Sequence, residues 1–345
     1  MLQLLLGGSG SGKTTLLYQR IRARAEKGEK SILLVPEQFT SSTEGRIYRE
    51  LGDALSGMVE SFSFTSLAEK ILSTEGGAAV QTLSDAGRAV LVRRALEELQ
   101  DNVHYYHRHR RSAAFCQMAA QTIDELKSAG LSGQQLAQLA GACGAESGKL
   151  SELALIFQGY ETLLARSGMD PSDRLELAGA RLEEALARHS LPEFLQDRAV
   201  FIDEFDTFNA PKKRLLGAML AALPSVTVAL CDDGAPLLPG DLSLFSGAKQ
   251  VAAQLRQLAR KNGAEVAVPQ LLRKDLRHRN APGLAAVAEL LETGSCTADA
   301  PAGEVRLFAA PSREEEARAA AGAIRRLMRQ GVRCGKIAVV CRDIA

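Results

Sequence analysis

The stretch that decides the fold is Gly7-Gly8-Ser9-Gly10-Ser11-Gly12-Lys13-Thr14-Thr15. It fits G-x-x-x-x-G-K-[ST], the Walker A pattern, in which glycines let backbone N–H groups surround phosphates. The apolar run Gln3–Leu6 before it predicts a buried parallel strand. The helical periodicity of Lys13–Lys27 after it predicts a helix whose N-terminal dipole favours the same anion. A glycine- and serine-rich loop that fits by chance would not need this strand and helix.

This loop predicts a site for ATP and Mg²⁺. All nine residues from Gly7 to Thr15 are candidates for binding the nucleotide. We expect Lys13 to supply a positive charge to the β and γ phosphates, and Thr14 to supply a hydroxyl ligand to the metal.

A pair of adjacent carboxylates is the expected acidic partner of this loop. The apolar run Ala199–Ile202 predicts a buried strand, and Asp203 and Glu204 follow it directly. We expect Asp203 to hold Mg²⁺ through water and Glu204 to act as the general base for the attacking water. The alternative is an apolar strand that happens to end in a charged turn. The long separation of Lys13 from Asp203 predicts an insertion between them.

The pattern of apolar residues divides the chain into five parts. Alternating strand and helix signals over 1–80 and 190–293 predict a split α/β domain with a RecA-like parallel sheet. Helical periodicity over 81–189 predicts a large all-helical insertion. The small and polar segment 294–303 predicts a linker. Signals over 304–345 predict the start of a second, truncated RecA-like domain.

That last part is expected to contain one strand–helix–strand unit. The predicted strands are Glu304–Ala309 and Lys336–Cys341, and the predicted helix between them is Ser312–Gln330. A parallel sheet needs more strands than these, so their edges are expected to lack neighbours.

Composition limits the possible classes of protein. The 345 residues include 42 Lys and Arg against 41 Asp and Glu, so the protein is not generally polybasic and any DNA contact must come from a local patch. No apolar run is long enough to span a membrane and no signal peptide is present, so we expect no membrane partner and a cytoplasmic location. The six cysteines form no C-x-x-C pair, which argues against a metal centre built by this chain alone.

One basic and aromatic cluster lies in the predicted insertion. It contains Tyr105, Tyr106, Arg108, Arg110 and Arg111. Arginines bind phosphates and tyrosines stack on bases, so the cluster predicts a DNA contact. The alternative is a solvated loop between two helices.

Several segments resemble motifs of superfamily 1 helicases. The segment 61–68, Ser-Phe-Ser-Phe-Thr-Ser-Leu-Ala, is similar to one that contacts single-stranded DNA in that superfamily. The resemblance implies that Phe62 and Phe64 stack on bases, although packing within a strand explains them equally well. The segment 203–208, Asp-Glu-Phe-Asp-Thr-Phe, resembles the D-E-F-Q-D motif. The segment 276–280, Leu-Arg-His-Arg-Asn, resembles N-Y-R-S, which implies by position that Arg279 reaches the γ-phosphate.

Two further stretches narrow the resemblance. Leu33–Thr40 (Leu-Leu-Val-Pro-Glu-Gln-Phe-Thr) and Gln121–Ser132 resemble the AddB family, the second subunit of the bacterial AddAB helicase–nuclease. The resemblance implies an AddA-like partner in a heterodimer, double-stranded DNA ends and single-stranded DNA as ligands, and a role in recombinational repair. In that family an iron–sulfur cluster and a nuclease domain lie in a C-terminal part that this chain lacks, and the motor is regarded as degenerate.

The sequence also departs from the helicase pattern. The glutamine expected after Phe205 is absent, as are the later motifs with their second arginine finger. We therefore expect that this chain alone neither unwinds nor cuts DNA, and whether it hydrolyses ATP stays open. Two alternatives remain: a P-loop ATPase or small-molecule kinase without a DNA role, and a self-sufficient superfamily 1 translocase. A kinase would not need a second sheet after residue 303, and a translocase would need the later motifs.

Overall fold

The computed structural model describes residues 1–77, 81–295 and 305–341. The chain forms two compact units, Met1–Arg277 and His278–Ala345. Within the described residues, no helix has both the length and the apolar character that crossing a membrane requires.

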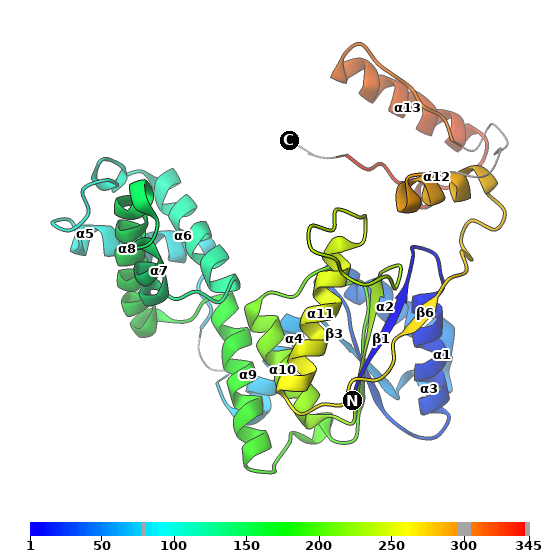
Figure 1. Cartoon of the computed structure of the whole chain (residues 1–345), viewed down its shortest axis with the longest axis horizontal. Helices are drawn as coiled ribbons and strands as arrows, with labels where there is room; N and C mark the ends of the chain where they lie inside the picture. Colours follow the sequence, from blue (N-terminus) through cyan, green and yellow to red (C-terminus); the bar gives the residue numbers. More distant parts are fainter. Residues whose placement is uncertain (78–80, 296–304, 342–345) are drawn as a thin grey trace. The chain divides into compact units, whose positions relative to one another are not determined.

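The first unit is built on a six-stranded sheet in the order β3-β2-β4-β5-β1-β6 (Figure 1). All five neighbouring pairs are parallel, so the carboxyl ends of the strands meet at one edge. This architecture fits the RecA-like α/β fold predicted from the sequence. The strands are β1 (Leu2–Gly7), β2 (Ser31–Leu34), β3 (Val59–Phe62), β4 (Ala199–Ile202), β5 (Ser225–Cys231) and β6 (Gln270–Leu272).

Both faces of the sheet are covered by helices, which explains why its strands are continuous apolar runs. Side chains alternate between the faces, so Leu4 and Leu6 join one core while Leu5 joins the other. The first core includes residues of α4, α9 (Pro171–Ala187), α10 and α11, and the second includes residues of α1 and α2. The helices around the sheet are α1 (Lys13–Ala25), α2 (Thr40–Leu51), α3 (Asp53–Ser56), α4 (Phe64–Glu75), α10 (Ala210–Ala222) and α11 (Ser246–Lys261).

The described residues between β3 and β4 form five further α-helices. They are α5 (Asp85–Glu98), α6 (Ala113–Ser128), α7 (Gly133–Ala140), α8 (Ser147–Ser167) and α9 (Pro171–Ala187). Helices α5 to α8 share a separate core that includes Val92, Ile123 and Phe157. Helix α9 instead packs against α4 and α10, and its Leu175 and Leu182 belong to the core of the sheet. The last helix of the segment predicted as one insertion is thus part of the layer on the sheet.

A buried polar network connects these two cores. Asp170, the N-cap of α9, is 1% exposed and accepts hydrogen bonds from the Tyr160 hydroxyl at 2.6 Å and from Lys127 Nζ at 2.8 Å. Lys127 also pairs with Asp173 at 2.9 Å. Because Lys127 lies on α6 and Tyr160 on α8, the network fixes the small helical core to the start of α9.

Two elements of the first unit differ from the sequence predictions. Packing of Phe64 within a strand was one of its two expected roles, but Phe64 begins α4, because Ser63 and Ser66 form a reciprocal capping box that starts a helix there. Strand β6 was not predicted, because three residues give too short a signal to separate from a loop.

The second unit contains α12 (Pro282–Thr293) and α13 (Arg313–Arg329). The strands expected at 304–309 and 336–341 are not formed at 305–309 or at 337–341. A strand requires a neighbour for its N–H and C=O groups, and the described residues of this unit offer neither segment one. Residue 304 and most of the predicted linker, 296–303, lie outside the described residues. Short 3₁₀ helices also occur, and they lie at Glu37–Phe39, His107–His109, Gly144–Glu146, Glu193–Leu195 and Cys334–Lys336.

Candidate functional site

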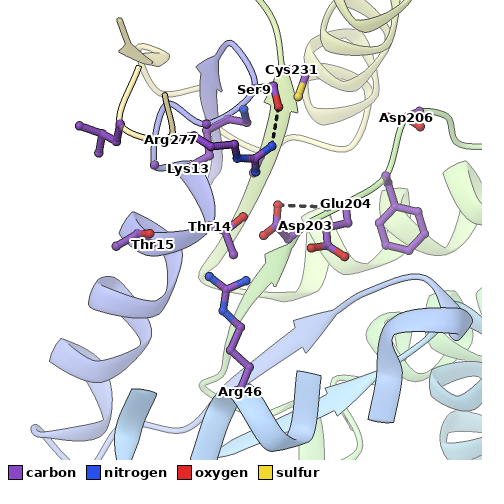
Figure 2. A pocket seen from close by; sticks show the side chains of 15 residues that line it. Ser9, Lys13, Thr14, Thr15, Arg46, Asp203, Glu204, Asp206, Cys231 and Arg277 are labelled. Carbon is purple, nitrogen blue, oxygen red and sulfur yellow. Dashed lines mark hydrogen bonds between the residues drawn. The ribbon is translucent and has the colours of Figure 1, made fainter. Parts of the chain in front are cut away.

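A cavity of about 450 Å³ opens at the edge where the strands end (Figure 2). The glycine-rich loop that joins β1 to α1 forms one wall, and the residues after β4 form another. The lining residues are Ser9, Gly10, Gly12, Lys13, Thr14, Thr15, Arg46, Asp203, Glu204, Phe205, Asp206, Ala229, Cys231, Leu276 and Arg277. The structure therefore brings together the two segments that the sequence analysis paired.

Two glycines of the loop adopt a backbone conformation that other residues rarely accept. Gly10 has φ +80° and Gly12 has φ +92°. A Cβ atom on Gly10 would also lie 2.5 Å from Cβ of Arg277, closer than real atoms approach. The loop thus needs glycine at this position both for its turn and for the close approach of the chain after β6.

The loop offers hydrogen-bond donors to a ligand in the cavity. Some have no partner, and others bond to carbonyl oxygens that a ligand could replace. Lys13 Nζ donates 2.8 Å hydrogen bonds to the carbonyl oxygens of Gly7 and Gly8. The Ser11 hydroxyl is buried, and among the described residues it meets no hydrogen-bond partner. The first N–H groups of α1 also lack intrahelical partners, as at every helix start. Together these groups suit an anion such as a phosphate.

A buried carboxylate faces this loop. Asp203 is 6% exposed, and it accepts a hydrogen bond from the Glu204 N–H at 3.0 Å. Burial raises the pKa of Asp203 above its ordinary value, although the nearby Thr14 hydroxyl, the Glu204 N–H and the charge of Lys13 oppose the rise. A hydroxyl and a carboxylate are oxygen ligands of the kind that Mg²⁺ prefers, and both groups line this cavity, so Thr14 and Asp203 could hold that ion.

Glu204 has an unusual backbone conformation. Its φ of +65° lies in the left-handed region, which costs a residue with a side chain about 1–2 kcal/mol. Such strain is typical of functional sites, where the surrounding fold holds a side chain in place. Burial first, and then the charge of Asp203, raise the pKa of the Glu204 carboxyl, while Arg46 opposes the rise.

Arg46 is a site residue that the sequence analysis missed. It lies on α2, and its guanidinium group sits 4.8 Å from the centre of the Tyr18 ring on α1. Figure 2 shows the guanidinium pointing towards Thr14 and Asp203. It belongs to none of the motifs considered, and only the placement of its helix beside α1 reveals it.

Arg277, rather than Arg279, lines the cavity. Arg277 Nη1 donates a 3.0 Å hydrogen bond to the Ser9 hydroxyl, and the preceding Leu276 N–H donates to the Gly10 carbonyl at 3.0 Å. Arg279 lies in the second unit, so its contact with a γ-phosphate stays a prediction.

The two phenylalanines predicted to stack on bases lie in different surroundings. Phe64 is 2% exposed and packs edge-on against Phe205, with ring centres 5.2 Å apart. The prediction that Phe64 stacks on bases is therefore wrong for this structure, because its ring is part of the hydrophobic core. Phe62 is only partly buried and its ring lies 6.5 Å from that of Phe194, so its role stays a prediction.

The predicted basic and aromatic cluster forms one loop between α5 and α6. The Glu152 carboxylate accepts hydrogen bonds from the backbone N–H groups of His104, Tyr105 and Tyr106 at 2.8–3.2 Å, which fixes the start of the loop. Tyr105 is 56% exposed, whereas Tyr106 packs against Phe115 with ring centres 5.3 Å apart.

The arginines of this loop differ in exposure. Arg108 and Arg111 are exposed, and Arg110 is partly buried beside His107. DNA binding by this loop stays a prediction.

Comparison with known proteins gives a consistent result. Residues 4–288 match the family model described as "ADDB, N-terminal". A protein of Desulforudis audaxviator, named as a subunit of an ATP-dependent helicase/deoxyribonuclease, is 34% identical over 358 aligned residues, which cover 100% of this chain. Proteins of the same name from Symbiobacterium thermophilum and Moorella thermoacetica are 33% and 32% identical over 99% of the chain. The chain spans 30% of the length of each of these relatives.

Proposed function

This chain belongs to the family described as "ADDB, N-terminal", and we propose that it is the ATP-binding part of one subunit of an ATP-dependent helicase/deoxyribonuclease. One observation carries the proposal: Lys13, Thr14 and Asp203 line one cavity although β4 follows α1 only after the whole helical segment. A loop that fitted the Walker A pattern by chance would not be expected to meet a buried carboxylate in this way.

In this proposal the glycine-rich loop is a P-loop. Its backbone N–H groups and the Ser11 hydroxyl donate to the phosphates, and Lys13 exchanges the carbonyls of Gly7 and Gly8 for the β and γ phosphates. Thr14 and Asp203 hold Mg²⁺, which when bound offsets the negative charge of the phosphates.

Glu204 is the proposed general base. A carboxylate whose pKa is raised by burial is a better proton acceptor than one in water, and the left-handed backbone fixes its position beside Asp203. Arg277 adds a positive charge on the opposite side of the loop, beside Ser9.

The wider role follows from the names of the relatives. We propose that the protein assembles with an AddA-like helicase–nuclease, engages double-stranded DNA ends and single-stranded DNA in the cytoplasm, and serves recombinational repair. The iron–sulfur cluster and nuclease expected of the family are assigned to sequence outside these 345 residues. The chain alone is proposed to bind nucleotide without unwinding or cutting DNA, and ATP-dependent degradation of linear duplex DNA by the purified chain would refute this.

Calorimetric titration with Mg·ATP tests the core of the proposal. Lys13→Ala is expected to weaken binding by at least about tenfold, because it removes the charge on the phosphates. The control is Lys27→Ala, which removes an exposed lysine just beyond the end of α1 and should leave the affinity unchanged. Equal ATP affinity of the wild type and Lys13→Ala would contradict ATP binding at this loop.

A further inference from the structure

One positively charged side chain of the cavity, that of Arg46, belongs neither to the glycine-rich loop nor to the segment of Asp203 and Glu204. Arg46 enters it from α2, and its guanidinium lies over the Tyr18 ring. Tyr18 is 5% exposed, and burial raises the pKa of its hydroxyl to about 12, so the side chain stays neutral. Contact with this buried ring restricts the motion of the guanidinium, which lowers the entropy lost when that group binds a ligand.

The guanidinium faces the part of the cavity where negative charge collects. In Figure 2 it points towards Thr14 and Asp203, and Glu204 lies on the same side. The charge of Arg46 lowers the pKa of both carboxyls, against the larger effect of burial. A nucleotide would add the charge of its phosphates to that of the two carboxylates, so a cation here becomes more favourable as phosphates are added.

We propose that Arg46 binds the terminal phosphate of the nucleotide and thereby makes the site prefer a triphosphate to a diphosphate. This inference rests on the proposed ATP site, and it assigns to α2 a role that none of the sequence motifs contains.

The position of Arg46 argues for the terminal phosphate rather than the others. The β-phosphate of a P-loop ligand lies within the loop, beside the N–H groups of Gly10 to Lys13. Arg46 lies outside that loop, on the side of Asp203 and Glu204 (Figure 2), where the γ-phosphate and the attacking water meet in such sites. The planar guanidinium matches two phosphate oxygens at once, which a lysine does not.

Paired titrations of the 345-residue chain with Mg·ADP and with Mg²⁺ and a non-hydrolysable ATP analogue test the inference. Arg46→Ala is expected to weaken the triphosphate by at least about tenfold and the diphosphate by less than about twofold, since a hydrogen bond to a charged group is lost only with the former. Arg46→Lys is expected to recover part of the preference, because it keeps the charge but loses the planar fork.

Two variants separate this role from a structural one. Arg49→Ala removes an exposed arginine from the same helix and should leave both affinities unchanged. Tyr18→Leu, which removes the ring but keeps Arg46, should reduce the triphosphate preference without altering diphosphate binding. Equal losses for both nucleotides in Arg46→Ala, or no loss, would overturn the inference while leaving the ATP site intact. A wild-type chain that binds neither nucleotide would overturn the proposed function, and this inference with it.

Discussion

Arg277 donates a 3.0 Å hydrogen bond from Nη1 to the hydroxyl of Ser9, a residue 268 positions earlier in the chain. The Leu276 N–H adds a second bond to the Gly10 carbonyl. The segment after β6 therefore holds the outer side of the glycine-rich loop in its present shape. No local signal in the loop itself indicates this support.

Loss of this contact should loosen the loop. Arg277→Ala is expected to speed amide hydrogen exchange at Ser9 to Gly12 and to weaken ATP binding by about threefold, a modest effect because the pair is exposed to solvent. Arg273→Ala, an exposed arginine just after β6, is the control and should change neither. Unaltered exchange in Arg277→Ala would show that the loop keeps its shape without this bond.

A side chain at Gly10 should abolish the site. Gly10→Ala combines a φ of +80° with a Cβ that meets Arg277, so we expect ATP affinity to fall by more than about tenfold. Gly28→Ala is a matched control, because Gly28 has φ +76° and its added Cβ would find open space. That control should cost about 1 kcal/mol of stability and leave the affinity unchanged. Calorimetric titration and thermal unfolding of both variants provide the comparison, and equal affinities would contradict the steric argument.

The buried carboxyl of Asp203 should destabilise the nucleotide-free protein at neutral pH. Its pKa is raised in the folded state above the value of 3.8 for an unperturbed group, so the folded state binds the proton more tightly than the unfolded state. The tighter proton binding stabilises the folded state fully at pH values below 3.8, and this stabilisation is lost as the pH rises through the pKa of Asp203 in the folded state. Asp203→Asn, which cannot ionise, is therefore expected to unfold at a higher temperature than the wild type at about pH 7.

Thermal unfolding without nucleotide from about pH 4 to about pH 7 measures this effect. Asp206→Asn, an exposed aspartate in the same turn, is the control and should follow the wild type. Asp203→Asn is also expected to lose the stabilisation that Mg·ATP gives the wild type. A lower unfolding temperature for Asp203→Asn at neutral pH would mean that the interactions of the carboxylate with Thr14 and with the Glu204 N–H outweigh the effect of burial.

The network at the start of α9 should matter for stability. Lys127→Met leaves the carboxylate of Asp170 buried without its cation, and breaking such a pair costs about 3 kcal/mol. Lys149→Met breaks a more exposed pair with Glu146 and should cost much less stability, because solvent screens the charges of such a pair. Urea unfolding followed by circular dichroism compares the two variants. Similar losses in the free energy of unfolding would mean that the network does not fix the small helical core to the start of α9.

If the loop between α5 and α6 binds DNA through its arginines, the affinity should fall as the salt concentration rises. Replacing Arg108, Arg110 and Arg111 together by alanine should reduce the slope of log affinity against log salt by up to about three units, if all three contact phosphates. The control replaces Arg93 and Arg94, which pair with Glu97 and Glu98 on α5 and are not expected to meet DNA. Fluorescence anisotropy with a labelled single strand at several salt concentrations measures the slopes. An unchanged slope would favour the alternative of a solvated loop.

The sequence predicted the parts of the site that depend on local patterns. The strand before Gly7, the helix after Lys13 and the strand before Asp203 follow from apolar runs and periodicity, and the structure contains all three. The placement of Lys13 and Asp203 in one site could be predicted only by combining two motifs.

The rest depends on packing between distant elements. Arg46 enters the site because α2 lies beside α1, and Arg277 because β6 pairs with β1. Phe64 was expected either to stack on bases or to pack within a strand, but the cap at Ser63 makes it the first residue of a helix. Neither helix contacts nor strand pairing can be read from a single segment of sequence.

The strand order has a consequence for how the protein is made. β1 leaves the ribosome before the other strands of this sheet, yet it pairs with β5 on one side and β6 on the other, as in Leu4 with Val228 and Leu6 with Leu271. At about 5–20 residues per second, its partners emerge more than about ten seconds later. During that interval the helices α5 to α8 can already fold on local contacts, whereas β1 remains an unpaired apolar segment. The site around the glycine-rich loop therefore cannot be complete until β4 and β6 have been made, and β1 must be kept from aggregating until its partners emerge.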